Sequence, residues 1–147
     1  MHSLLSIENL SVDFITDQQI IHAVKNISLE INRSEILAIV GESGSGKSVT
    51  SLSILQLLPK PPAKYSSGKI IFSEDGKTIT DVLNASAKNL QQIRGHKIAM
   101  IFQEPMTSLN PVMSCGKQVV EALLIHKKIS FAEAKKQTVE WFEKVGK

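Results

Sequence analysis

The residues best placed to do chemistry form a glycine-rich run, GESGSGKS at positions 41–48, which matches the pattern G-x-x-x-x-G-K-[ST] in full. An apolar run, ILAIV at 36–40, precedes it, and a helical pattern follows it. Glycines let the backbone turn several N–H groups toward phosphate oxygens at the positive end of the following helix. We expect Lys47 to bind the β and γ phosphates of a nucleotide and Ser48 to give its hydroxyl to Mg²⁺.

The loop predicts that the chain binds phosphate groups, but it does not identify the reaction that the protein catalyses. The same loop serves kinases, GTPases, helicases, DNA-repair ATPases and transporter ATPases equally well. A simpler alternative is a glycine-rich turn with a solvated lysine, but the apolar run and the helix on either side disfavour it. The class of protein must therefore be inferred from residues outside 41–48.

Other kinds of site are not supported by the composition. The four histidines lack metal-ligand spacing, and the single cysteine, Cys115, excludes both an internal disulfide and a familiar zinc site. We interpret Cys115 as a small core residue. The net charge is +3, but the basic residues are scattered and rarely interleaved with aromatic residues, so no nucleic acid partner is expected. Neither an export signal nor a membrane-spanning run is expected.

The first two thirds of the sequence predict an α/β arrangement. Apolar and polar residues nearly alternate over 5–14 and strictly alternate over 27–31, which indicates antiparallel strands. The continuous apolar run 36–40 and the segment 97–102, which is apolar after Lys97, predict strands buried on both faces. Helices are expected at 47–58, ending near Pro59, and at 87–93. The segment 59–69, with three prolines, is expected to be a loop that leads into a short strand at 69–72.

The last part of the sequence has a helical pattern. Ser130 and Glu133 form a capping box, which predicts that a helix begins there. The apolar residues expected to share one face of the preceding helix are Val119, Val120, Leu123 and Leu124. Those expected on the buried side of the final helix are Phe131, Ala134, Trp141, Phe142 and Val145.

Two segments carry a family resemblance. VGESGSGKSVT at 40–50 and RGHKIAMIFQEPMTSLNP at 94–111 resemble the ATP-binding subunits of ABC transporters, and the EPMTSLNP part resembles their oligopeptide and dipeptide import branch. The resemblance continues to WFEKVG at 141–146. It implies an incomplete α/β P-loop fold of the ABC type, with the antiparallel β subdomain and part of the core sheet in 1–110 and the start of the helical subdomain in 111–147.

The resemblance also implies roles for individual residues. Gln103 would be the glutamine that contacts Mg²⁺ and the attacking water, and Phe14 would stack on adenine, although core packing is a rival role for Phe14. The loop 104–112, with Met106, Leu109 and Met113 in or beside it, would dock on membrane subunits. Residues expected to bind the phosphates of ATP are Gly41, Ser43, Gly44, Ser45, Gly46, Lys47, Ser48 and Val49.

The full-length relative would bind Mg-ATP, pair head to tail with a second ATP-binding subunit, and drive peptide uptake through integral membrane subunits at the cytoplasmic face of the membrane. Two alternatives stay open. One is a P-loop kinase or DNA-repair ATPase, which the segment 103–111 disfavours. The other is a truncated product that does not catalyse ATP hydrolysis.

Part of the family's catalytic machinery is not found within the sequence. No apolar run that ends in Asp-Glu follows Gln103, and the acids Glu74 and Asp75 precede it, so we expect these two to be surface residues. The signature motif, the Walker B acids, the D-loop and the switch histidine would lie beyond Lys147. Two apolar strands with unpaired edges predict that the chain alone is unstable or oligomeric.

Overall fold

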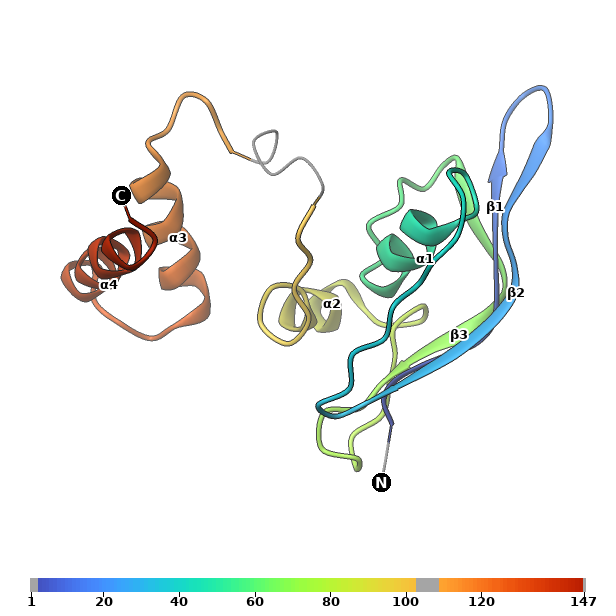
Figure 1. The fold of residues 1–147 in the computed structure, drawn as a ribbon, viewed down its shortest axis with the longest axis horizontal. Helices are drawn as coiled ribbons and strands as arrows, with labels where there is room; N and C mark the ends of the chain where they lie inside the picture. Colours follow the sequence, from blue (N-terminus) through green and yellow to red (C-terminus); the bar gives the residue numbers. More distant parts are fainter. Residues whose placement is uncertain (1–2, 103–108, 147) are drawn as a thin grey trace. The chain divides into compact units, whose positions relative to one another are not determined.

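A computed structural model describes residues 3–102 and 109–146 of the chain. The chain divides into two compact units, Met1–Ile98 and Ala99–Lys147, and each is described by itself (Figure 1). Among the residues described, the first unit holds a sheet and two helices, and the second holds two further helices.

The first unit is built on a four-stranded sheet in the order β2-β1-β3-β4. Its strands are β1 Ser3–Ile15, β2 Ile20–Asn32, β3 Ala63–Phe72 and β4 Thr80–Asp81, and all neighbours pair antiparallel. The prediction of antiparallel strands from the alternation at 5–14 and 27–31 is therefore confirmed. The apolar residues of that alternation lie on one face, where Leu10 and Val12 are fully buried together with Ile70 of β3.

Helices α1 Lys47–Ile54 and α2 Ala87–Ile93 belong to the same unit, and the predicted bounds of α2 are confirmed. Helix α1 ends before residue 58 because Gln56 adopts a left-handed conformation, with φ of 48°. Arg94, which follows α2, donates from Nε to the Leu55 carbonyl at 2.8 Å and from Nη2 to the Gln56 carbonyl at 2.9 Å. Because cations stabilise the carbonyl end of a helix, Arg94 fixes the end of α1 relative to α2.

Two predicted strands, 36–40 and 97–102, are wrong in this structure. Both segments lack regular strand pairing, and Ile36, Val40 and Ile101 are 97%, 88% and 94% exposed. A strand is defined by hydrogen bonds to a neighbour, and among the described residues neither segment has a ladder partner. Such apolar runs are usually buried in folded proteins, but the described residues leave much of these two segments exposed.

The predicted loop at 59–69 is also wrong from Ala63 onward, where β3 begins. Its residues pair with β1, and the partners include Ala63 with Phe14 and Tyr65 with Val12. The prolines stop before the strand starts, so they do not interrupt its hydrogen bonds. The exposed surface positions predicted for Glu74 and Asp75 are confirmed.

The second unit contains α3 Cys115–His126 and α4 Phe131–Lys144. Val120, Leu123 and Ala134 form its small core, with Val119 and Ile129 packed against it. The predicted cap is confirmed, since the Glu133 N–H donates to Ser130 Oγ at 3.2 Å.

Several residues expected in the core of this unit are exposed instead. Phe131, Trp141 and Val145 are 64%, 44% and 74% exposed, and Leu124 is 38% exposed. The small residues Ala134 and Thr138 occupy the centre of the α3–α4 contact, so the larger side chains lie outside it. Cys115 is exposed because it is the first residue of α3, which makes its assignment to the core wrong.

Over the residues that the structure describes, none of the helices has both the length and the apolar character needed to cross a membrane.

The exposed apolar segment 36–40 generates a prediction about association. We expect the chain alone to self-associate, and we expect Ile36→Lys or Val40→Lys to shift it toward monomer, because a charge disfavours burial of the segment between copies. Size-exclusion chromatography with light scattering measures this. Ile79→Lys, at another isoleucine that is 69% exposed, is the control and should change little. A wild-type chain that is a monodisperse monomer with a cooperative thermal transition would contradict the prediction.

Candidate functional site

The glycine-rich loop lies between the extended segment 36–40 and the first turn of α1. Gly44 and Gly46 have φ of 79° and 88°, in the left-handed region that favours glycine. Gly46 is the N-cap residue of α1, and the Ser45 N–H donates to the Glu42 carbonyl at 3.3 Å within the loop. The glycines therefore make the tight turn that joins the extended segment to the helix.

Gly46 also lies in close contact with the sheet. A Cβ atom at position 46 would lie 2.5 Å from the Ala23 carbonyl oxygen and 3.2 Å from Val24 Cγ2, both in β2. Such distances leave no room for a side chain. The absence of a side chain thus lets the start of α1 rest directly on the backbone of β2.

Lys47 directs its ammonium group back over the loop. Its Nζ donates to the carbonyls of Gly41 and Glu42 at 2.7 and 2.6 Å, and it lies 3.2 Å from Ser45 Oγ. The single positive charge therefore lies inside the curve of the loop. These contacts fix the lysine where it can meet an anion held by the same loop.

The first turn of α1 presents backbone donors next to this charge. The first helical hydrogen bond runs from the Thr50 N–H to the Gly46 carbonyl at 2.8 Å, so it leaves the N–H groups of Lys47, Ser48 and Val49 ahead of it. The N-cap makes no side-chain hydrogen bond to them, and the first turn has no acidic residue. The helix dipole adds a partial positive charge at the same end, so the arrangement suits an anion.

The loop and β2 enclose a pocket of about 550 Å³. β2 contributes residues between His22 and Leu29, and the loop contributes Gly41, Gly44, Ser45, Gly46 and Lys47. Among the described residues that line it none is acidic, while Lys25 and Lys47 are basic. The volume falls within the range of ordinary ligand sites.

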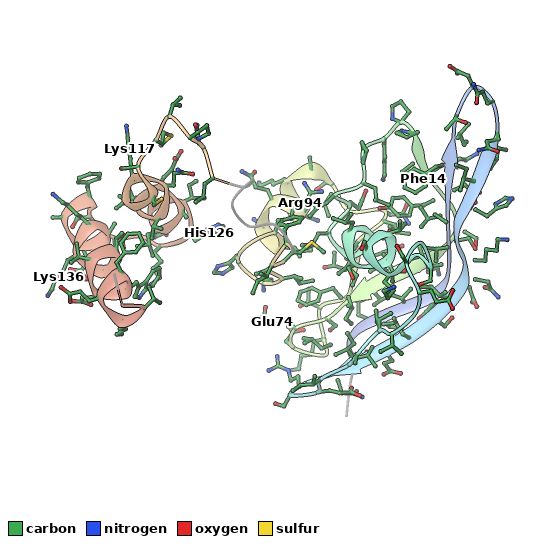
Figure 2. All side chains as sticks on the ribbon, turned by 45° about the horizontal axis from the view of Figure 1, so that its top comes forward. Phe14, Glu74, Arg94, Lys117, His126 and Lys136 are labelled. Atoms are coloured by element: carbon green, nitrogen blue, oxygen red, sulfur yellow. The ribbon has the colours of Figure 1, made fainter. Side chains whose placement is uncertain are left out.

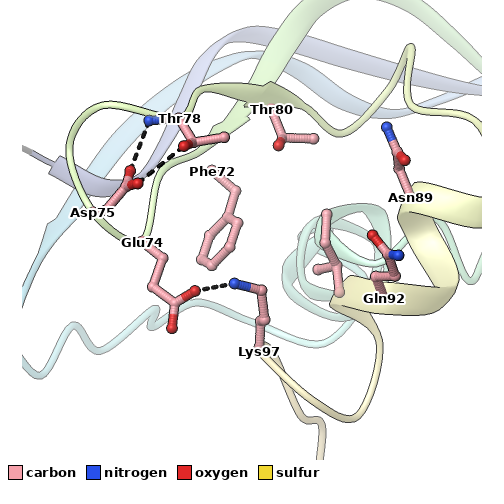
Figure 3. A pocket seen from close by; sticks show the side chains of 9 residues that line it. Phe72, Glu74, Asp75, Thr78, Thr80, Asn89, Gln92 and Lys97 are labelled. Carbon is pink, nitrogen blue, oxygen red and sulfur yellow. Dashed lines mark hydrogen bonds and ion pairs between the residues drawn. The ribbon is translucent and has the colours of Figure 1, made fainter.

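A second pocket, of about 340 Å³, lies between the β3–β4 connection and α2 (Figure 3). Hydrogen bonds from the backbone N–H groups of Thr78 and Lys77 lower the pKa of Asp75 to about 2. The hydrogen bond from Lys97 lowers the pKa of Glu74, so both carboxylates are ionised at neutral pH. Their negative charge opposes a phosphate ligand, so the pocket beside Lys47 is the better candidate for the nucleotide.

The donors at the loop fit a nucleotide with its metal only in part. Lys47 and the first-turn N–H groups suit phosphate oxygens, and the exposed Ser48 can offer one hydroxyl oxygen to Mg²⁺. Within the described ranges no group of three or more histidine, cysteine or acidic side chains could hold a metal. Mg²⁺ bound here would thus depend on the nucleotide's own oxygens, which is its usual mode of binding.

Phe14 lies near the end of β1 and is half-buried (Figure 2). Alternation along β1 places it on the same face as Val12, whose partner Val24 touches the start of α1. It does not line the pocket of about 550 Å³. Its face is therefore compatible with a role beside the loop, and adenine stacking stays a prediction. Gln103 and Met106 lie outside the described residues.

The sequence reasoning did not identify two contributions to the site. Thr50 donates from Oγ1 to the Gly46 carbonyl at 3.0 Å and so stabilises the turn, and Gly46 lies against the Ala23 carbonyl and the Val24 side chain. A threonine four residues after the last loop glycine is a signal for the first contact, because its hydroxyl can reach the i−4 carbonyl. The second contact joins residues 22 and 23 positions apart and leaves no local signal.

A lysine held inside a glycine-rich turn at the N-terminus of a helix defines the phosphate-binding loop of P-loop nucleotide-binding proteins. Comparison with known proteins assigns the class more narrowly. Residues 24–147 match the family described as ABC transporter. The chain belongs to the ABC transporter family.

Individual relatives agree with this assignment. An oligopeptide transport ATP-binding protein of Bacillus subtilis is 48% identical over 143 residues, which cover 97% of this chain and 38% of the relative. A dipeptide transport ATP-binding protein of the same species is 45% identical over 146 residues, covering 99% of this chain and 42% of the relative. The chain thus spans less than half the length of these curated relatives.

A solved dimeric structure of a bacterial ABC transporter cassette superimposes with a TM-score of 0.77 at 26% identity, over 95% of this chain and 56% of that one. A second solved structure, of a protein from Clostridium perfringens that is part of an ABC transporter complex, gives a TM-score of 0.62 at 28% identity, over 99% of this chain and 51% of that one. The predicted family and the predicted partial ABC-type fold are confirmed.

The contact between Gly46 and β2 yields a matched pair of variants. Gly44→Ala meets no atom within 4 Å and should cost only the left-handed backbone strain, about 1–2 kcal/mol of unfolding free energy. Gly46→Ala should cost about 2–5 kcal/mol, because overpacking against β2 adds to the same strain. Urea unfolding monitored by circular dichroism gives both values. Equal costs for the two variants would show that α1 does not rest on β2.

Proposed function

We propose that the chain is the ATP-binding part of a subunit that powers peptide import by an ABC transporter. The observation that carries this proposal is the position of Lys47 within a glycine-rich turn at an acid-free helix N-terminus. The names of the two Bacillus subtilis relatives refer to oligopeptide and dipeptide transport, and a further relative is a glutathione import ATP-binding protein of Shigella boydii. These names support short peptides as the transported class.

The loop binds the nucleotide's phosphates through its backbone N–H groups, from Ser43 to Val49. Lys47 exchanges its contacts with the Gly41 and Glu42 carbonyls for the β and γ phosphate oxygens. Ser48 gives its hydroxyl to Mg²⁺, which when bound neutralises charge on the phosphates. The residues of the chain itself thereby hold the anion in place, and none of the described residues that line the pocket beside Lys47 is acidic.

Two further residues complete the proposed site. Phe14 stacks on the adenine from the face of β1 that carries Val12, since an aromatic ring accepts the π-face of any base. Gln103 contacts Mg²⁺ and the attacking water. The sequence segment 41–49 alone binds the phosphates, so nucleotide binding can be tested apart from hydrolysis.

The proposed setting of this site is the cytoplasmic face of the membrane. A second ATP-binding subunit and integral membrane subunits are the proposed partners, and one similar solved cassette is dimeric. Leu109 and Val112, which are 39% and 87% exposed, lie in the segment proposed to dock on the membrane subunits. We also propose that the β subdomain and the P-loop core end at residue 110 and that the helical subdomain begins at residue 111.

Nucleotide affinity tests the proposal directly. Lys47→Ala should weaken binding of a fluorescent ATP analogue roughly 10- to 100-fold, because a charge-assisted hydrogen bond contributes about 1.5–3 kcal/mol. Lys69→Ala, at an exposed lysine of β3 outside the pocket, should leave the affinity unchanged. Removal of Mg²⁺ with a chelator should also weaken binding of the wild type. Equal binding by the wild type and Lys47→Ala would reject the loop as the phosphate site.

A further inference from the structure

The start of α4 carries a concentration of positive charge that the nucleotide site does not use. Residues 127–136 contain four lysines, Lys127, Lys128, Lys135 and Lys136, and one acidic residue, Glu133. Lys128, Lys135 and Lys136 are exposed, and Lys136 projects from the outer side of α4 (Figure 2). Across the described chain neither of the two ion pairs involves these three residues.

The fourth lysine has a different environment. Lys127 Nζ lies 3.2 Å from Gln137 Oε1 and 5.4 Å from the centre of the Trp141 ring. A cation held over an aromatic ring is already partly compensated. The charge available to a partner therefore comes from Lys128, Lys135 and Lys136.

Exposed apolar side chains lie among these lysines. Phe131 is 64% exposed and Val139 is 49% exposed, and with Lys135 between them they follow each other at intervals of four residues along α4. Residues four apart lie on one face of a helix, so the three form a stripe. The buried residues Ala134 and Thr138 mark the side that contacts α3, which places the stripe beside that contact.

The acidic residue in this region does not neutralise the stripe. Glu133 Oε1 accepts a hydrogen bond from the Gln137 amide at 3.0 Å, one turn along α4. Glu133 and Gln137 lie two positions away from Lys135 on either side, a spacing that places them on another part of the helix surface. Lys135 therefore has no acidic residue three or four positions away, whereas Lys136 has Glu133 three positions before it and Glu140 four positions after it. Neither glutamate takes part in the two ion pairs found among the described residues.

We propose that this α4 surface, made of Lys128, Phe131, Lys135, Lys136 and Val139, binds the surface of an anionic lipid bilayer. An aromatic side chain can enter the boundary between headgroups and acyl chains, and lysines around it are attracted to anionic headgroups. Lysine side chains that no neighbour holds in place suit a fluid array of headgroups better than a protein partner of fixed geometry. The proposal extends the proposed function, because it concerns a surface separate from the nucleotide pocket.

Sedimentation of the full chain with vesicles tests this surface. We expect binding to phosphatidylcholine vesicles that contain phosphatidylglycerol, and none to pure phosphatidylcholine. The triple variant Lys128→Gln, Lys135→Gln, Lys136→Gln should bind on the order of a hundredfold more weakly, since each lysine near an anionic surface contributes about fivefold. Added salt should weaken the binding of the wild type. A sample without vesicles corrects for self-association.

A matched control separates this surface from net charge. The triple variant Lys69→Gln, Lys77→Gln, Lys88→Gln removes the same charge from exposed positions of the first unit and should bind like the wild type. Equal weakening by the two triple variants, or equal binding of the wild type to both kinds of vesicle, would overturn the proposal. So would binding to polyglutamate with none to vesicles, which would assign the surface to an acidic protein.

A fluorescence measurement locates the contact even if a triple variant folds poorly. Trp141 is the single tryptophan, so Phe131→Trp combined with Trp141→Phe places one reporter in the stripe. Its emission should shift to the blue with phosphatidylglycerol vesicles, and circular dichroism should confirm that the helices remain. Emission that stays at the water-exposed wavelength while the chain is bound would show that another surface makes the contact, and would overturn the proposal.

Discussion

The close approach of Gly46 to the backbone of β2 is the constraint on which the site depends. The 2.5 Å between a Cβ at this position and the Ala23 carbonyl oxygen leaves only glycine, and so the start of α1 lies directly on the sheet. Thr50, one turn into α1, donates a hydrogen bond from its hydroxyl to the Gly46 carbonyl and stabilises the same turn. With its start fixed in this way, α1 aims its first N–H groups and Lys47 into one pocket, and the electrostatic character of that pocket follows from backbone geometry.

Charge then distinguishes this pocket from the pocket of about 340 Å³ described above. The pocket beside the loop has lysines and backbone donors, whereas the pocket beside α2 has two carboxylates whose pKa values are lowered by hydrogen bonds. Hydrogen bonds that stabilise Asp75 as an anion also complete the turn of residues 75–78, so that the acid has a structural role. Asp75 thus lies in a turn of the second pocket, whereas no acidic residue is among the described residues that line the pocket beside the loop.

Local patterns in the sequence were enough to predict the elements whose partners lie close by. The alternation around Leu10, the bounds of α2 and the cap at Ser130 were all predicted correctly, as was the position of the loop before a helix. Failures came where a distant neighbour decides the outcome. The apolar run at 36–40 indicates that the segment needs burial, but it does not indicate which residues would cover it. Residues 63–67 form a strand because they pair with β1, which is distant in the sequence. Likewise, Trp141 is exposed because Ala134 occupies the helix contact, which hydrophobicity alone could not foretell.

Arg94 connects the far end of α1 to α2. Helix α1 is about 12 Å long, by its rise per residue. The phosphate-binding loop leads into the N-terminus of α1. The guanidinium group of Arg94 donates hydrogen bonds to the two carbonyls just after its C-terminus. Arg94 directly follows the last residue of α2. A displacement of the loop along the axis of α1 would therefore be transmitted through Arg94 to α2, so the phosphate-binding loop and α2 are mechanically coupled.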